Sequence, residues 1–176
     1  MGLNFEVIPS SFDESGTAVT APNEYVMELA SQKARDIARG IDDGIIIGAD
    51  TVVVVDGEIL GKPIDPADAR RMLRLLSGRS HSVLTGVCVI QMSGGREAHS
   101  SVAFESTRVF FAPLTNEIID AYVATGEPLD KAGAYGIQER GCVLIERIEG
   151  DYFNVVGLPV YRVSRMLMEI GVPLFG

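Results

Sequence analysis

The chain has little of several features on which whole classes of protein depend. Its 176 residues contain no tryptophan, only two cysteines, and only three lysines among 15 basic residues. The 24 acidic residues give a formal net charge of −9, which argues against general binding to nucleic acid or to an anionic membrane. No apolar run approaches the roughly 20 residues that span a bilayer, and no basic-then-apolar leader opens the chain. We therefore expect a cytoplasmic protein with neither nucleic acid nor membrane as a partner.

The few cysteines and histidines also exclude some kinds of site. Cys88 and Cys142 have neither the spacing of metal ligands nor the number needed for a disulfide framework. Both stand in apolar, strand-like sequence, so we expect two small core residues. His81 and His99 have no partner at metal-ligand spacing and are expected to be surface or hydrogen-bonded residues.

The length predicts one domain, or two tightly joined lobes, that buries about two-thirds of its surface. Capping residues and glycines mark the helix ends, in the pairs Thr20 and Gly40, Asp65 and Gly78, and Thr115 and Gly126. Helices are expected at about 22–39, 66–78, 115–124 and 158–171. Strands are expected at 5–8, 45–55, 58–60, 81–90, 101–111, 142–148 and 152–156.

The stretch IIIGADTVVVVDGEILGKP, residues 45–63, is the first anomaly. Its apolar runs are typical of a buried strand, yet Asp50 and Thr51 interrupt them. A carboxylate in that setting is costly to desolvate unless a cation, a metal or several hydrogen bonds hold it. Asp56 and Gly57 predict a tight hairpin turn, and the return strand leads to Lys62. The hairpin therefore indicates either a structural ion pair or an active site.

Two charged residues of the first helix stay ambiguous on spacing alone. Lys33 falls within the apolar stripe that includes Val26 and Ile37, where it is either a site residue or a lysine whose stem packs while its ammonium reaches water. Glu24 lies in the first turn, where the helix dipole favours an acid without any function.

The segment GEPLDKAGAYGIQ, residues 126–138, is the second anomaly. It is too irregular for a regular element and holds Asp130, Lys131, Tyr135 and Gln138 among its glycines. Glycine-rich loops let backbone amides approach a phosphate or a ring closely, so the segment indicates a ligand-binding loop. The alternative is a plain surface loop.

Four motifs, GADTVVVVDGEILGKP, LSGRSHSV, GEPLDKAGAYGIQ and GDYFNVVGLP, resemble in order those of the Maf family of nucleoside triphosphate pyrophosphatases. The resemblance runs over nearly the whole chain from Phe5 onward. It implies a single domain over residues 1–176 with a mixed α/β fold, in which an elongated twisted sheet is flanked by helices and a cleft separates two lobes. It also implies a homodimer and a house-cleaning hydrolase that converts a nucleoside triphosphate to the monophosphate and pyrophosphate.

The same resemblance implies roles for individual residues. Asp50 resembles the general base, with Glu24, Lys33 and Lys62 as its catalytic partners. Glu24 and Asp50 would contact a divalent metal, Mg²⁺ or Mn²⁺. The residues expected to bind the substrate are Thr51, Lys131 and Gln138. The string around Gln138 resembles the branch of the family that hydrolyses dTTP and UTP.

The sequence departs from the family pattern at its front, since no Ser-Pro-Arg-Arg occurs in it. Family members open with a strand and a Ser-Pro-Arg-Arg loop whose arginines face the triphosphate. We therefore expect a chain that lacks that strand and its phosphate clamp. Two alternatives follow: a nucleotide-binding or interaction module linked to septum formation, and a 7-methyl-GTP pyrophosphatase.

Overall fold

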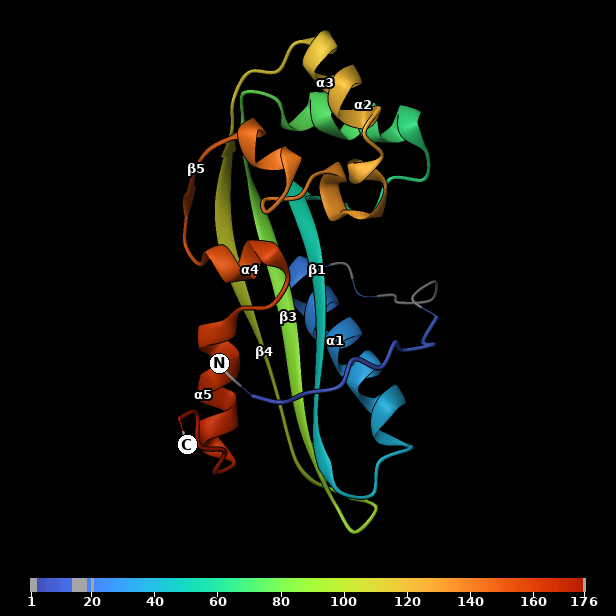
Figure 1. Cartoon of the computed structure of the whole chain (residues 1–176), viewed down its shortest axis with the longest axis vertical. Helices are drawn as coiled ribbons and strands as arrows, with labels where there is room; N and C mark the ends of the chain where they lie inside the picture. The colour runs from blue at the N-terminus through green and yellow to red at the C-terminus, as the bar shows by residue number, and fades with distance from the viewer. Residues whose placement is uncertain (1–2, 14–18, 20, 176) are drawn as a thin grey trace. The chain divides into compact units, whose positions relative to one another are not determined.

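The computed structural model describes residues 3–13, 19 and 21–175 (Figure 1). A five-stranded antiparallel sheet has the strand order β2-β1-β3-β4-β5, with helices packed against it. The strands are β1 (Gly44–Val55), β2 (Glu58–Leu60), β3 (Ser80–Ser93), β4 (Arg96–Phe111) and β5 (Ile145–Glu149). The helices are α1 (Pro22–Ala38), α2 (Pro66–Leu76), α3 (Asn116–Val123), α4 (Tyr152–Val156) and α5 (Val160–Glu169). Short 3₁₀ turns occur at η1 (Glu127–Asp130), η2 (Ala132–Ala134) and η3 (Arg140–Leu144). The expected mixed α/β fold is confirmed.

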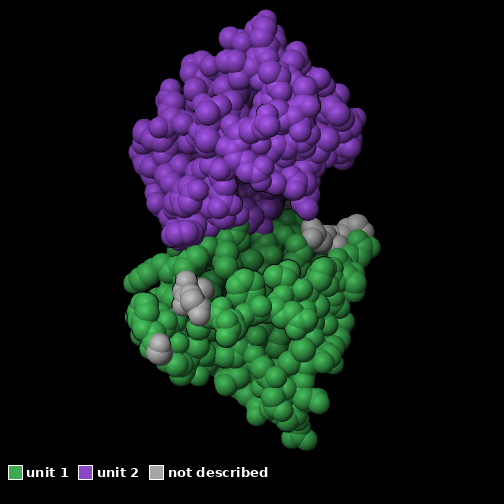
Figure 2. Space-filling view, in the orientation of Figure 1, with its two compact units in different colours: residues 1–50, 85–105, 157–176 green, residues 51–84, 106–156 purple. Residues whose placement is uncertain are grey.

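The chain divides into two compact units, coloured separately in Figure 2. Unit 1 comprises residues 1–50, 85–105 and 157–176, and unit 2 comprises residues 51–84 and 106–156. Along β1 the division falls between Asp50 and Thr51. Within the described ranges, no helix is both long enough and apolar enough to cross a membrane.

Unit 1 packs a helix on each face of its strands. Cys88 and Ile90 of β3 pack with Ala30, Ala34 and Ala38 of α1. Val87 and Val89, which alternate with them, pack with the α5 residues Val163, Met166 and Leu167. Because successive side chains of a strand point to opposite faces, α1 and α5 cover opposite faces of β3. This burial on both sides explains why β3 reads as a continuous apolar run.

Unit 2 is built around the β1–β2 hairpin and two helices. Asp56 (φ 51°) and Gly57 (φ 81°) both have left-handed backbone conformations, as a two-residue hairpin turn requires, and Val55 pairs with Glu58. The Asp65 side chain caps α2 by accepting a hydrogen bond from the Asp68 amide at 2.7 Å. The buried face of α2 is the predicted one: Ala69, Met72, Leu73 and Leu76. Thr115 caps α3 as predicted.

Four expectations from the sequence are wrong. Residues 5–8 do not form a strand: they pair with no strand in the described part of the chain, and Phe5 and Val7 remain 83% and 76% exposed. Cys142 is exposed because it lies in η3, where the chain turns with a period near three residues. The predicted strand at 142–148 accordingly begins only at Ile145. Thr20, the predicted cap of α1, lies outside the described residues, and Ala21 stands at the cap position.

The fourth error is the predicted strand at 152–156, which is the short helix α4. The Asp151 carboxylate accepts a hydrogen bond from the Phe153 amide at 2.8 Å, which turns the chain at the helix start. The buried Asn154 donates to the Val83 carbonyl at 2.9 Å and to the Thr107 hydroxyl at 3.0 Å. These polar contacts override the β-propensity of the flanking valines and aromatics.

Candidate functional site

A short ion pair links α1 to β1 in unit 1. The Lys33 ammonium donates a hydrogen bond to Oδ1 of Asp50 at 2.6 Å, and the two side chains are 24% and 11% exposed. The lysine that spacing left ambiguous therefore points toward the acid that interrupts the apolar strand. Its charge compensates for the desolvation of a largely buried carboxylate.

Two glycines explain how α1 comes close enough for this contact. A Cβ at Gly48 would lie 2.3 Å from the Ala30 carbonyl oxygen, and one at Gly86 would lie 2.2 Å from the Val26 carbonyl oxygen. Neither space can hold a methyl group, so the helix backbone rests directly on β1 and β3. Lys33 follows Ala30 by three residues, and Asp50 follows Gly48 by two. The close approach therefore sets the position of the ion pair.

The structure does not bring Glu24 to this pair along the helix. Glu24 is exposed in the first turn of α1, nine residues before Lys33. At about 3.6 residues per turn, nine residues are roughly two and a half turns, which places the two side chains on opposite sides of α1. The role of Glu24 stays a prediction.

Unit 2 brings together the other two lysines of the chain. The Gly133 amide donates to the Gly61 carbonyl at 3.0 Å, so the glycine-rich segment is joined to the residue that precedes Lys62. Lys131 donates to the Asp130 carboxylate at 2.7 Å. This hydrogen bond lowers the pKa of Asp130, and the charge of Lys62 contributes in the same direction. Two cations thus lie near one carboxylate.

Sequence reasoning missed Glu127, which organises the glycine-rich segment. Its carboxylate accepts hydrogen bonds from the Arg140 amide at 3.0 Å, the Gly141 amide at 3.0 Å and the Tyr122 hydroxyl at 2.9 Å. Burial alone would raise the pKa of Glu127, but these three hydrogen bonds outweigh it and lower the pKa. An acid in the sequence Gly-Glu-Pro gave no signal of this role, because the donors are 5 to 14 residues away.

The two predicted base-selecting residues also belong to unit 2. Thr51 is half-buried on β1, directly after Asp50, and Gln138 is exposed between η2 and η3. The predicted site residues therefore divide between the units: Glu24, Lys33 and Asp50 in unit 1, and Thr51, Lys62, Lys131 and Gln138 in unit 2.

His81 was expected to be a surface or a hydrogen-bonded residue. It is hydrogen-bonded, and it lies in the core of unit 2. Its Nε2 lies 2.7 Å from the Tyr135 hydroxyl, and its ring packs edge-on against Phe111 and Tyr135. Only 4% of the residue is exposed, and burial lowers its pKa to about 4. His81 is therefore a neutral core residue.

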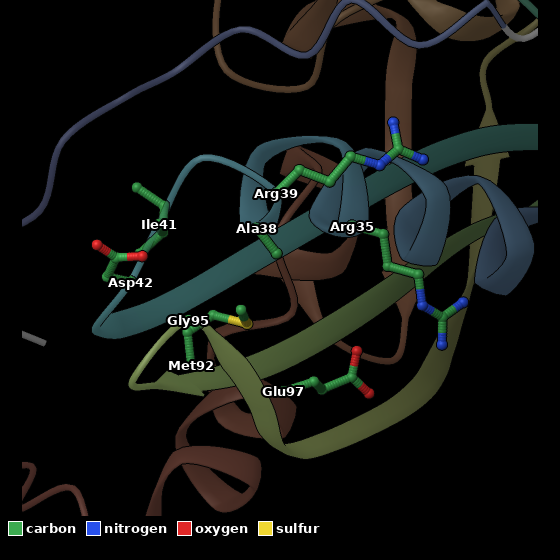
Figure 3. A pocket seen from close by; sticks show the side chains of 8 residues that line it. All are labelled: Arg35, Ala38, Arg39, Ile41, Asp42, Met92, Gly95 and Glu97. Atoms are coloured by element: carbon green, nitrogen blue, oxygen red, sulfur yellow. The ribbon is translucent and has the colours of Figure 1, made fainter.

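Unit 1 also contains a cavity of about 350 Å³ at the end of α1 (Figure 3). Two arginines, Arg35 and Arg39, line it together with two carboxylates, Asp42 and Glu97. Their formal charges cancel, so the cavity does not offer the excess of positive charge that a triphosphate requires. None of the predicted site residues lines it.

Comparisons with known proteins identify a matching family and several similar proteins. The Maf-like protein family matches residues 1–170. A dTTP/UTP pyrophosphatase of Moorella thermoacetica is 53% identical over 176 residues, 100% of this chain and 89% of the relative. Proteins with the same name from Symbiobacterium thermophilum and Methanosarcina barkeri are 52% and 45% identical, over 99% of this chain and 88% and 87% of their own lengths. The chain therefore belongs to the Maf family.

Proposed function

We propose that the protein is a nucleoside triphosphate pyrophosphatase that hydrolyses dTTP and UTP to the monophosphate and pyrophosphate. Curated relatives that carry this name match 97–100% of the chain at 45–53% identity. The observation that carries the proposal within this chain is the largely buried pair of Lys33 and Asp50, at 2.6 Å. A carboxylate kept in a strand at such a desolvation cost is a candidate for chemistry.

The reaction adds water across the anhydride between the α and β phosphates. The water oxygen bonds to phosphorus, the bridging bond breaks, and pyrophosphate leaves. In the proposed mechanism Asp50 orients the water and takes its proton as general base. Lys33 fixes the carboxylate through their hydrogen bond and holds its position during the attack.

The substrate carries about four negative charges, and the chain has a net charge of −9. Attraction must therefore come from local cations. Lys62 and Lys131 both lie near the Asp130 carboxylate in unit 2, and we assign them to the phosphates. Their ammonium groups act as point charges that neutralise phosphate oxygens.

A divalent metal fits this donor set only in a limited way. No group of three or more His, Cys, Asp or Glu side chains suited to a metal ion occurs among the residues that the structure describes. Mg²⁺ is commonly held by one or two carboxylates together with substrate phosphates and water. Asp50 offers such a carboxylate, whereas Glu24, the second predicted one, lies on the opposite side of α1 from Lys33. When bound, Mg²⁺ or Mn²⁺ would neutralise charge on the polyphosphate and lower the pKa of water.

Base selection is assigned to Thr51 and Gln138. A side-chain amide has both donors and an acceptor, and a hydroxyl can serve as either. The Watson–Crick edge of uracil or thymine presents a donor between two acceptors, which such a pair complements. The 5-methyl group that distinguishes thymine makes no hydrogen bond, so a site that reads only this edge would accept both dTTP and UTP.

A nucleotide panel tests the proposal directly. Pyrophosphate release is measured with dTTP, UTP, CTP, dATP, GTP and 7-methyl-GTP in the presence of Mg²⁺. We expect the largest kcat/KM for dTTP and UTP. Release of orthophosphate instead of pyrophosphate would contradict the cleavage position. Preference for 7-methyl-GTP would contradict the assignment of Gln138, and binding of nucleotides without turnover would favour a non-catalytic module.

A further inference from the structure

The segment from Gly136 to Gly141, which carries Gln138, is closed at its base. A Cβ at Gly141 would lie 2.5 Å from the Gly136 carbonyl oxygen and 3.1 Å from its amide nitrogen. The two glycines therefore touch backbone to backbone. Gln138 lies between them and is exposed. The segment is a small loop with its ends pinned and its amide-bearing residue on the surface.

One carboxylate holds both ends of this loop. Glu127 accepts directly from the Arg140 and Gly141 amides at the far end. It reaches the near end through Tyr122, whose hydroxyl donates to Glu127 at 2.9 Å and accepts from the Gly136 amide at 3.2 Å. Hydrogen bonds from amides to a charged carboxylate are among the stronger ones in proteins.

We call Glu127, Tyr122 and their hydrogen bonds to the loop the clamp. Tyr122 anchors this clamp in the core. Tyr122 is a residue of α3 with 6% exposure, and it belongs to the same buried cluster as Ile119 and Val123. Burial raises the pKa of its hydroxyl, so the hydroxyl stays a donor toward Glu127 throughout the working pH range. The loop is thereby tied to a packed helix rather than to another loop.

The near end of the loop also contacts Lys131, which we assign to the substrate phosphates. A Cβ at Gly136 would lie 3.3 Å from Cε of Lys131 and 3.6 Å from Oε1 of Glu127. The stem of Lys131 thus passes over the near end of the loop. Fixing Gly136 therefore fixes the surface against which this lysine packs.

We propose that Glu127 and Tyr122 are positioning residues that set nucleobase selectivity by holding the Gly136–Gly141 loop in one conformation. This inference rests on the proposed function, since it takes Gln138 as the residue that reads the base. A loop that is ordered before the nucleotide binds loses less conformational entropy on binding. A loop that must order on binding weakens affinity and admits bases with a different pattern of donors and acceptors.

Two variants test the clamp, each with a matched control. Tyr122→Phe removes both hydroxyl contacts and keeps the ring in the core, and Tyr161→Phe is its control because Tyr161 is 73% exposed. Glu127→Gln replaces one acceptor oxygen by a donor that faces the Arg140 or Gly141 amide. Its control is Glu146→Gln, an exposed residue of β5 in the same unit. Glu127→Gln also serves as the second variant should Tyr122→Phe fail to fold.

We expect both clamp variants to raise KM for dTTP and UTP by about tenfold or more. The preference for dTTP over CTP should fall by about the same factor. The kcat should stay within about threefold of the parent. Amide hydrogen exchange at Gly136, Arg140 and Gly141 should accelerate, while exchange in α2 stays unchanged. The controls should match the parent in every measurement.

The outcomes separate the inference from the proposed function. A parent protein that releases no pyrophosphate from dTTP or UTP contradicts the proposed function, and the selectivity role of the clamp with it. A parent that does so, with clamp variants whose exchange accelerates but whose KM and selectivity are unchanged, overturns the inference alone and leaves the two residues a structural role. Unchanged exchange in both variants also overturns it.

Discussion

Lys33 of α1 and Asp50 of β1 form a hydrogen-bonded ion pair at 2.6 Å, 17 residues apart in the chain. The contact joins the helix to the strand residue at which the apolar sequence is interrupted. The Lys33 ammonium therefore reaches a carboxylate rather than only water, and its part in a site stays a prediction. The pair is both a structural contact and the centre of the proposed chemistry, and these two roles make different predictions.

The catalytic role predicts that Asp50→Asn removes most turnover while leaving the protein folded. Asparagine is close in shape but cannot accept the proton from water, and loss of a general base typically lowers the rate by about 10²- to 10⁴-fold. The measurement is pyrophosphate release from dTTP, alongside circular dichroism. Asp42→Asn, an exposed carboxylate of the same unit, is the control and should keep full activity. Near-normal turnover by Asp50→Asn would remove this residue from the mechanism.

The structural role predicts a measurable coupling between the two side chains. A double-mutant cycle with Lys33→Met and Asp50→Asn should give a coupling on the order of 1–3 kcal/mol in the free energy of unfolding, because the pair is largely shielded from water. Denaturant titration of the four proteins measures it.

The comparison pair is Arg79 and Asp56, which are joined by two hydrogen bonds of 2.7 Å but are 42% and 66% exposed. Solvent screening should make its coupling several-fold smaller. Equal coupling in the two pairs would mean that burial adds nothing to the contact between Lys33 and Asp50.

The glycine contacts predict a steric route to breaking the same pair. Gly48→Ala and Gly86→Ala each place a methyl group 2.2–2.3 Å from a carbonyl oxygen of α1, so the helix must move away. We expect each variant to lose about 1–3 kcal/mol of stability or more, as overpacked cores do. Gly40→Ala is the control, since its Cβ would have only one neighbour, at 3.8 Å. Equal melting temperatures for the three variants would contradict this, because they would show that α1 can shift without loss of stability.

The sequence predicted those parts of the fold that depend on local chemistry. The caps at Asp65 and Thr115 and the turn at Asp56 and Gly57 are each determined by residues within a few positions of one another. The anomaly at Asp50 was visible for the same reason, because a charged residue in an apolar run needs no partner to be noticed.

What the sequence could not give is the identity of distant partners. Spacing alone left Lys33 ambiguous, and only the structure shows that its ammonium contacts Asp50, 17 residues further along the chain. That pairing depends on the close seating of α1, which no local pattern encodes. The error at 152–156 has the same origin, since the contacts of Asn154 with Val83 and Thr107 span 71 and 47 residues.

The buried histidine predicts how stability depends on pH. Burial lowers the pKa of His81 from its usual 6.5 to about 4, so the unfolded chain binds a proton at this residue at higher pH than the folded protein does. Its contribution to stability is therefore complete above about pH 6.5 and decreases as the pH falls toward 4, with a slope approaching about 1.4 kcal/mol per pH unit and a total on the order of 3 kcal/mol. Denaturant titration between pH 4 and 8 measures the slope.

The comparison that isolates His81 uses two variants over the same pH range. His81→Phe cannot bind a proton, so its stability should lack this slope even if the variant is less stable at every pH, because the hydrogen bond to Tyr135 is lost as well. His99→Gln keeps His81 and should retain the slope. A charged imidazolium at position 81 would have to be accommodated between the rings of Phe111 and Tyr135, with Nδ1 buried and without a hydrogen-bond partner in the described structure. A slope that persists in His81→Phe would assign the acid sensitivity to the carboxylates instead.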